Sequence, residues 1–189
     1  MSGDGEPRRI SKDAGWHAAD FADNGEFYVD SFSSAATPPQ LSLHRADGSR
    51  IDFIEENRLD KTHPYHPYVA TRPSTEFGTL RAEDGQALYY RMLKPVGFDA
   101  GKRYPVIVYV YGGPMGQSVT NQWAVGFLEI LARDGFVVFT VDNRGTGFRG
   151  TAFDAPIYQR MGDVEVRDQI AGIDYLQSLD FVGESLNLQ

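Results

Sequence analysis

A run of β-branched and aromatic residues from Val106 to Tyr111 constrains the fold of this chain more than any other feature. An unbroken apolar run of this length is typical of a strand buried on both faces, as in the middle of a parallel sheet. It ends abruptly at Gly112-Gly113-Pro114, where the backbone can bend and other groups can approach it closely. Because α/β proteins bind ligands at the carboxyl ends of such strands, this loop is a candidate site. An ordinary strand followed by a turn is the alternative interpretation.

Composition places the chain among globular proteins and argues against several functions. Its 189 residues are enough for one large domain or two small ones. A net charge of −8 argues against a nucleic-acid partner, which would need a basic face. No apolar run approaches the roughly 20 residues of a membrane helix, and the first ten residues lack the apolar core of a signal peptide. The absence of cysteine excludes disulfides and thiolate metal sites and leaves the compartment open.

The first 70 residues consist of short segments with strand periodicity, separated by turn signals such as Asp23-Asn24-Gly25 and Asp47-Gly48. This pattern predicts strands over residues 15–21, 26–32, 40–45 and 49–55. Four such strands form an antiparallel meander that would make one blade of a β-propeller. Because a blade buries both faces only beside its neighbours, we expect it to be the end of a longer array.

Residues 57–75 contain three prolines and no periodicity, which predicts a linker and a domain boundary between residues 73 and 74. His63 and His66 in this segment could suggest a metal site. Their neighbouring prolines and the lack of a third nearby ligand argue against it, so we expect neither a metal nor a cofactor. His17 and His44 fall on predicted strands and are interpreted as ordinary surface or half-buried residues.

From residue 76 onward, strands alternate with helices. We expect a hairpin over residues 77–81 and 87–94, the central strand described above, and a second buried strand over residues 136–141. Thr120 or Asn121 could cap a first helix, with an apolar face made by Trp123, Phe127, Leu128, Ile130 and Leu131. A second helix over residues 164–179 would be capped by Asp163 and turn Val166, Ile170, Ile173, Leu176 and Leu179 inward. Right-handed crossovers would make the two buried strands parallel in one sheet.

Two glycine motifs resemble functional signatures without their context. Gly145 to Gly150 spells G-x-G-x-x-G, but three residues separate it from the strand and we expect the next helix more than ten residues later. This spacing argues against a dinucleotide site, in which the motif opens a helix. Ser185 lies in G-E-S-L-N, which lacks the closing glycine of a nucleophile elbow. Because Phe181-Val182 is too short for the buried strand an elbow needs, we do not expect Ser185 to be a nucleophile.

With both halves considered, the chain resembles the prolyl oligopeptidase family of serine peptidases, and most of all bacterial dipeptidyl peptidase IV. The resemblance is carried by VYVYGGP at residues 108–114, FTVDNRGTG at 139–147 and GDVEVRDQIAGIDYL at 162–176, together with the blade segment DNGEFYVDSFSSAATPPQLSL. It implies the N-terminal half of an α/β-hydrolase domain, a mixed sheet with flanking helices, over residues 74–189. The preceding residues 1–73 would be the last antiparallel blade of a β-propeller and a linker.

The resemblance implies a serine exopeptidase that releases N-terminal dipeptides with proline or alanine second, through an acyl-enzyme. Tyr111 matches the tyrosine whose hydroxyl helps to stabilise the oxyanion in this family, and Gly112 and Gly113 would leave room for substrate. Without the resemblance, a strand-end aromatic that packs on the sheet edge is the simpler interpretation of Tyr111. Relatives are often periplasmic or secreted, and a homodimer is a further expectation of the resemblance.

The family pattern also predicts what this chain lacks. The nucleophile elbow follows one further strand in the family, so we expect the serine, aspartate and histidine of the triad to be absent and the chain alone to be inactive. We also expect an unpaired apolar edge beside the second buried strand, and hence marginal stability or self-association. Alternatives are a piece of an endo-acting oligopeptidase or acylaminoacyl peptidase, or a non-catalytic binding or assembly module on a hydrolase scaffold.

Overall fold

The computed structural model describes residue 6 and residues 8–188, with the side chains of residues 184–188 excepted. The described chain forms two units. Unit 1 contains the residues up to Pro67 together with Asn121–Ala124, and unit 2 contains the other residues from Tyr68 onward. The domain boundary after residue 73 stays a prediction.

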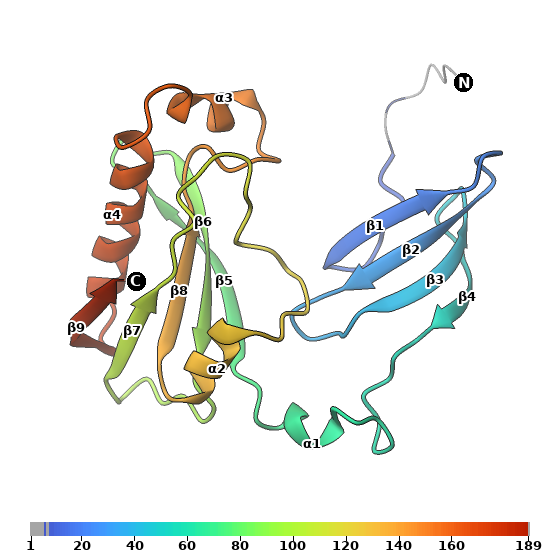
Figure 1. Ribbon diagram of the computed structural model, residues 1–189, viewed down its shortest axis with the longest axis horizontal. Coiled ribbons are helices and arrows are strands. Elements are labelled where there is room, and N and C mark those ends of the chain that lie inside the picture. Colours follow the sequence, from blue (N-terminus) through green and yellow to red (C-terminus); the bar gives the residue numbers. More distant parts are fainter. Residues whose placement is uncertain (1–5, 7, 189) are drawn as a thin grey trace. The chain divides into compact units, whose positions relative to one another are not determined.

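Unit 1 is a four-stranded antiparallel meander in the order β1-β2-β3-β4 (Figure 1). Its strands are β1 (Trp16–Phe21), β2 (Phe27–Ser33), β3 (Gln40–Arg45) and β4 (Arg50–Glu55). The sequence-based strands are confirmed to within one residue at each end. Gly25 has the positive φ of 69° that the first hairpin turn requires, and its N–H donates to the Ala22 carbonyl at 2.8 Å. A short helix, α1 (His66–Val69), lies in the linker.

Unit 2 is built on a five-stranded mixed sheet in the order β5-β6-β8-β7-β9. Its elements along the chain are β5 (Ser74–Arg81), β6 (Ala87–Lys94), β7 (Tyr104–Val108), α2 (Phe127–Arg133), β8 (Val137–Asp142), α3 (Thr151–Asp154), a 3₁₀ turn (Ala155–Ile157), α4 (Val164–Gln177) and β9 (Val182–Leu188). The expected hairpin is confirmed, and β7 and β8 are parallel as the crossover rule predicts. Strand β8 lies between β6 and β7, and all six of its residues are buried.

The two longer helices pack on opposite faces of this sheet. Ala132 of α2 packs with Leu93 and Val138, whereas Leu176 of α4 belongs to the cluster that contains Phe139. Val138 and Phe139 are consecutive in β8, so their side chains point to opposite faces. The sheet therefore forms the middle layer of unit 2.

The first helix begins later than the sequence predicts. Its N-cap is Gly126, and Asn121 instead accepts a hydrogen bond from the Ala35 N–H at 2.9 Å within unit 1. Only part of the expected apolar face is covered, because Phe127 and Ile130 are more than half exposed whereas Leu128 and Leu131 pack on the sheet. Arg133 and Gly135 do end this helix as expected, and Gly135 has a φ of 99°.

The second helix confirms its expected position and part of its expected inward face, since Leu176 is buried in the core and Leu179 packs against it. The buried residues of α4 are Val164, Glu165, Asp168, Gly172 and Leu176, whereas Val166 and Ile170 are nearly half exposed. Gly172 allows this orientation, because a Cβ there would lie only 3.2 Å from both Phe139 and Val141. Asp163 occupies the N-cap position without a capping side-chain hydrogen bond.

The tail of the described chain corrects a further expectation. The sequence predicts that Phe181-Val182 is too short for a buried strand, whereas residues 182–188 form the strand β9, which pairs in parallel with β7. Strand β8 has partners on both sides, so the unpaired edge expected beside it is wrong. The self-association that was inferred from that edge stays a prediction without this premise. The backbone of Ser185 lies inside β9, and its side chain lies outside the described ones.

Candidate active site

Tyr111 lies on the segment of residues 109–119 that directly follows β7, and this stretch is called the Tyr111 segment. The expected buried strand is shorter than predicted, because β7 ends at Val108 and the next three residues are 39–55% exposed. The Tyr109 N–H still donates to the Phe139 carbonyl at 2.8 Å, which keeps the segment beside β8. The Tyr111 hydroxyl donates to the carbonyl oxygen of Pro114 at 3.3 Å. Tyr111 therefore offers an accessible hydroxyl at the carboxyl end of the parallel strands.

Glycines shape the turn around the Tyr111 ring. Gly112 has a φ of 71°, which favours glycine, and a Cβ on Gly113 would lie 3.3 Å from the ring. Gly116, which sequence reasoning did not single out, lies under the same ring, and a Cβ there would overlap it. In the sequence, the only indication of its role was that a further glycine follows Gly112-Gly113-Pro114 two residues later. The Tyr111 ring thus packs against the backbone of the glycine-rich turn that follows it.

The loop after β8 supports the Tyr111 segment from the side. The carboxylate of Asp142 accepts hydrogen bonds from the N–H groups of Ser118 (2.9 Å) and Val119 (3.1 Å). The Gly145 carbonyl accepts one from the Met115 N–H at 3.0 Å. Burial raises the pKa of Asp142 above its ordinary value, although these N–H groups favour the ionised form.

A buried ion pair joins this loop to α4. Asp168 is fully buried and accepts three hydrogen bonds from Arg144, from its backbone N–H, its Nε and its Nη2, at 2.6–3.0 Å. Arg144 also binds Asp84, and this hydrogen bond lowers the pKa of the Asp84 carboxyl. Sequence reasoning missed the pair. In the sequence, the only indication of this pair was a charged residue, Asp168, on the predicted helix four residues after the apolar Val164.

An apolar cavity of about 690 Å³ adjoins the same segment. Its lining residues are Pro114 and Met115 of the Tyr111 segment and Thr151, Asp154, Ala155, Ile157, Tyr158, Gln159 and Met161.

The spacing expected for the G-x-G-x-x-G motif is wrong, because the helix α3 starts directly after Gly150. The helix has only four residues, so the motif does not open a full helix turned toward a phosphate.

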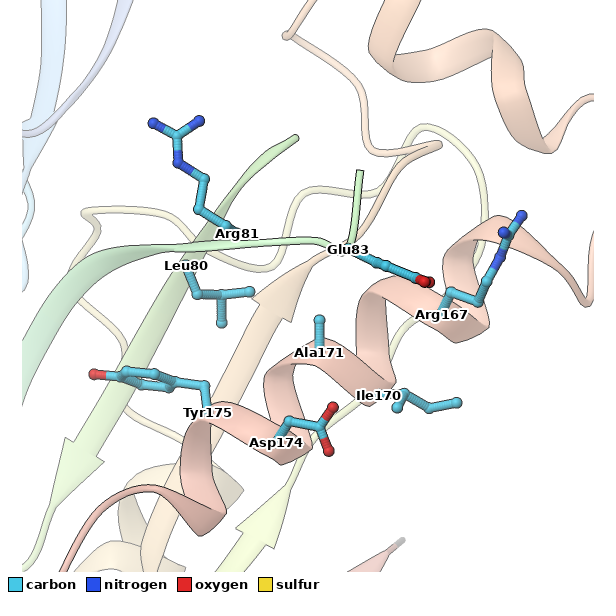
Figure 2. A pocket seen from close by; sticks show the side chains of 8 residues that line it. All are labelled: Leu80, Arg81, Glu83, Arg167, Ile170, Ala171, Asp174 and Tyr175. Atoms are coloured by element: carbon cyan, nitrogen blue, oxygen red, sulfur yellow. The ribbon is translucent and has the colours of Figure 1, made fainter. Parts of the chain in front are cut away.

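A second cavity, of about 510 Å³, lies between the end of β5 and α4 (Figure 2). Figure 2 shows Leu80, Ala171 and Tyr175 among its lining side chains, with the charged Arg81, Glu83, Arg167 and Asp174 around them. None of its eight lining residues is a serine or histidine, and none belongs to the Tyr111 segment. It therefore offers no nucleophile–base pair.

Serine–histidine and histidine–aspartate contacts do occur in unit 1, but they do not form a triad. Ser42 Oγ lies 2.8 Å from His44 Nε2, and the other ring nitrogen of His44 faces the Gly48 carbonyl at 3.3 Å. Ser42 is buried in the sheet, where a substrate carbonyl cannot reach it. His17 instead pairs with Asp30 at 2.7 Å. These contacts stabilise the blade and lack the geometry for acyl transfer.

Within the described residues, no group of three or more histidine, aspartate or glutamate side chains could hold a metal ion. Both ring nitrogens of His63 face polar groups, the Asn57 side chain at 2.9 Å and the Tyr65 N–H at 3.0 Å. None of the helices in the described part of the chain is long and apolar enough to span a membrane.

Comparisons with known proteins agree on one relationship. Residues 124–186 match the family model described as prolyl oligopeptidase family. Dipeptidyl peptidase 8 of Mus musculus is 31% identical over 188 residues, covering 94% of this chain and 21% of that protein. A solved structure of a Bacteroides ovatus protein assigned as dipeptidyl aminopeptidase IV is 35% identical, with a TM-score of 0.84, covering 93% of this chain and 25% of that one. Dipeptidyl peptidase 4 of Porphyromonas gingivalis is 31% identical with a TM-score of 0.81, covering 92% of this chain and 24% of that one.

The fold and these matches define an α/β-hydrolase sheet preceded by an antiparallel β-propeller blade, as the sequence predicts. The chain belongs to the prolyl oligopeptidase family. It spans about a fifth to a quarter of the length of the relatives that it matches.

Proposed function

We propose that this chain is part of a serine-type dipeptidyl peptidase and supplies an oxyanion-binding hydroxyl from Tyr111. The complete enzyme would release N-terminal dipeptides with proline or alanine second by acyl-enzyme hydrolysis. The observation that carries the proposal is the match to two bacterial dipeptidyl peptidase structures over both units and more than nine-tenths of the chain.

The chemistry of Tyr111 supports this role. When a serine attacks a peptide carbonyl, negative charge develops on the carbonyl oxygen and is stabilised by donors already in place. An exposed tyrosine hydroxyl on a glycine-rich turn can supply such a donor, since it needs only to leave the Pro114 carbonyl. The described residues do not assemble a triad, so we also propose that the 189-residue chain alone does not turn over substrate.

The test uses the polypeptide of the complete reading frame and the 189-residue chain side by side. We expect a fluorophosphonate to label the former and not the latter, and Gly-Pro-p-nitroanilide to be cleaved only by the former. Tyr111→Phe should lower kcat by roughly a hundred- to a thousand-fold, the usual loss for one oxyanion donor. Tyr109→Phe, on the same exposed segment, is the matched control and should keep full activity. Equal activity of Tyr111→Phe and wild type would contradict the assigned role.

An endo-acting prolyl peptidase is a second candidate, because a protein named prolyl endopeptidase FAP from Bos taurus is 30% identical over 170 residues. The two candidates differ in their need for a free amino terminus. A dipeptidyl peptidase should cleave Gly-Pro-p-nitroanilide and leave the N-acetylated substrate intact, whereas an endopeptidase should cleave the acetylated one. The ratio of kcat/KM for these two substrates decides between them.

A further inference from the structure

Two consecutive residues of α4 hold two consecutive residues of the loop after β8. Asp168 binds Arg144 through three hydrogen bonds, as described above. The next residue, Gln169, donates from Nε2 to the Asn143 side-chain oxygen at 2.8 Å and to the Val141 carbonyl at 3.2 Å. Two consecutive side chains of α4, those of Asp168 and Gln169, therefore bind two consecutive residues of the loop, Arg144 and Asn143.

Asn143 is itself buried and faces the segment that carries Tyr111. Its Nδ2 donates to the Arg144 carbonyl at 2.6 Å and reaches the Gly112 carbonyl at 3.5 Å. Because the Asn143 oxygen accepts from Gln169, the orientation of this amide is set, with Nδ2 toward Gly112. Gly112 directly follows Tyr111 in the chain, so Gln169 fixes the orientation of a group that touches the Tyr111 turn.

The same loop holds the far side of the turn. The Met115 N–H donates to the Gly145 carbonyl at 3.0 Å, so Gly112 and Met115 are both attached to the loop after β8. Between these two attachments lies Pro114, whose carbonyl accepts the Tyr111 hydroxyl. The position of that hydroxyl thus depends on a loop that α4 holds in place.

We propose that Gln169 and Asn143 are positioning residues that set the Tyr111 hydroxyl for oxyanion binding through this turn. The inference rests on the proposed function, because it assigns the network to the same donor. Oxyanion stabilisation depends on a donor placed before the charge develops, so loosening its support weakens transition-state binding more than substrate binding. Neither residue is expected to touch the substrate.

The kinetic test is a double-mutant cycle in the polypeptide of the complete reading frame. Gln169→Met keeps the length of the side chain and removes its donors, and we expect kcat to fall by roughly tenfold with KM unchanged. In a Tyr111→Phe background the same change should alter kcat less than about twofold, because the group it positions is gone. Gln86→Met is the matched control, since the Gln86 amide donates to a backbone carbonyl, Ala87 at 3.2 Å, away from the turn. It should leave kcat unchanged in both backgrounds.

The outcomes separate this inference from the proposed function. If Tyr111→Phe lowers kcat but Gln169→Met does not, or if the two effects multiply, the positioning role is wrong and the function stands. If Tyr111→Phe itself has no effect, the oxyanion role of Tyr111 is wrong and the positioning role falls with it. Asn143→Ala should behave like Gln169→Met in the cycle.

Amide hydrogen exchange on the 189-residue chain gives a readout that does not depend on activity. In Gln169→Met, the Met115 amide should exchange at least about tenfold faster, while the central strand β8 keeps its wild-type exchange. Gln86→Met should leave the Met115 amide unchanged. Equal exchange at Met115 in wild type and Gln169→Met would overturn the proposed link between α4 and the turn.

Discussion

At the scale of single residues, unit 2 contains several charged side chains that are almost removed from water. Asp142 is 2% exposed, and its second oxygen, Oδ2, has no hydrogen-bond partner. Arg91 and Arg149 supply positive charge that favours the ionised carboxylate, and burial in turn lowers the pKa of Arg91. For Asp142 burial outweighs these charges and the two N–H donors, so its pKa is raised.

This raised pKa predicts a pH dependence of stability. The folded chain binds the Asp142 proton more tightly than the unfolded chain, whose carboxyl titrates near 3.8. The stabilisation from that proton is complete below pH 3.8 and is lost as the pH rises through the folded-state pKa. Asp142→Asn keeps an acceptor oxygen but does not titrate, so wild type should lose stability relative to the variant over this window. Urea unfolding of both proteins from below pH 3.8 to neutrality measures the difference. A difference that stays constant with pH would contradict the assignment.

The buried ion pair between Arg144 and Asp168 gives a second prediction at this scale. Asp168→Asn leaves Arg144 without its buried counter-charge, which typically costs roughly 3–5 kcal/mol of unfolding free energy. Asp163→Asn breaks the exposed ion pair with Arg167 on the same helix and should cost less than about 1 kcal/mol. Urea unfolding at neutral pH compares the two variants with wild type. Equal losses would mean that Asp168 is not desolvated as its burial indicates.

At the scale of secondary-structure elements, the sequence predicts which elements exist better than where they end or which way they face. The strands of unit 1 and the order of elements in unit 2 follow from local patterns that need no partner. The orientation of α4 does not, because Ile170 and Leu176 look alike in the sequence. Their difference arises from Gly172, which fits against β8, and from Asp168, which pairs with a loop distant in sequence. The end of β7 and the pairing of β9 also depend on neighbouring strands.

The same reasoning separates the parts of the candidate site. Tyr111 could be singled out because it ends an apolar run before a glycine turn, and family resemblance gave it a chemical role. Asn143 and Gln169 could not be singled out in the same way. An asparagine in a loop and a glutamine in a helix carry no local signal that they form a hydrogen bond with each other, 26 positions apart in the chain. Polar networks that join elements are thus the part of a site that a single sequence conceals.

The orientation of α4 can be tested with two aliphatic residues that the sequence expects to be equivalent. Leu176 is fully buried and Ile170 is 49% exposed. Leu176→Ala should cost roughly 2–5 kcal/mol of unfolding free energy by leaving a cavity, whereas Ile170→Ala should cost less than about 1 kcal/mol. Urea denaturation followed by circular dichroism measures both. A larger loss for Ile170→Ala would restore the inward face that the sequence pattern predicts.

At the scale of the whole molecule, the chain passes between its two units more than once. It enters unit 2 after Pro67, returns to unit 1 at Asn121 and re-enters unit 2 at Val125. Residues 121–124 are thus distant in sequence from the blade to which they belong. In unit 1 the Asn121 side chain accepts from the Ala35 N–H, and the Trp123 N–H donates to the Ser33 hydroxyl at 3.3 Å. The end of β2 and the residues that follow it are therefore stabilised by a segment that lies 86 to 90 residues later in the chain.

This arrangement predicts an effect of Asn121 on the stability of unit 1. Asn121→Ala removes the acceptor for the Ala35 N–H and should cost about 1 kcal/mol, the usual net contribution of such a hydrogen bond. The two tryptophans, Trp16 and Trp123, both belong to unit 1, so tryptophan fluorescence follows its unfolding directly. We expect the fluorescence transition in urea to move to lower denaturant in Asn121→Ala and to stay in place in the neighbouring control Gln122→Ala. If the variant instead moved only the circular dichroism transition of the α4 helix, Asn121 would belong to unit 2, and the helix start that the sequence predicts would be restored.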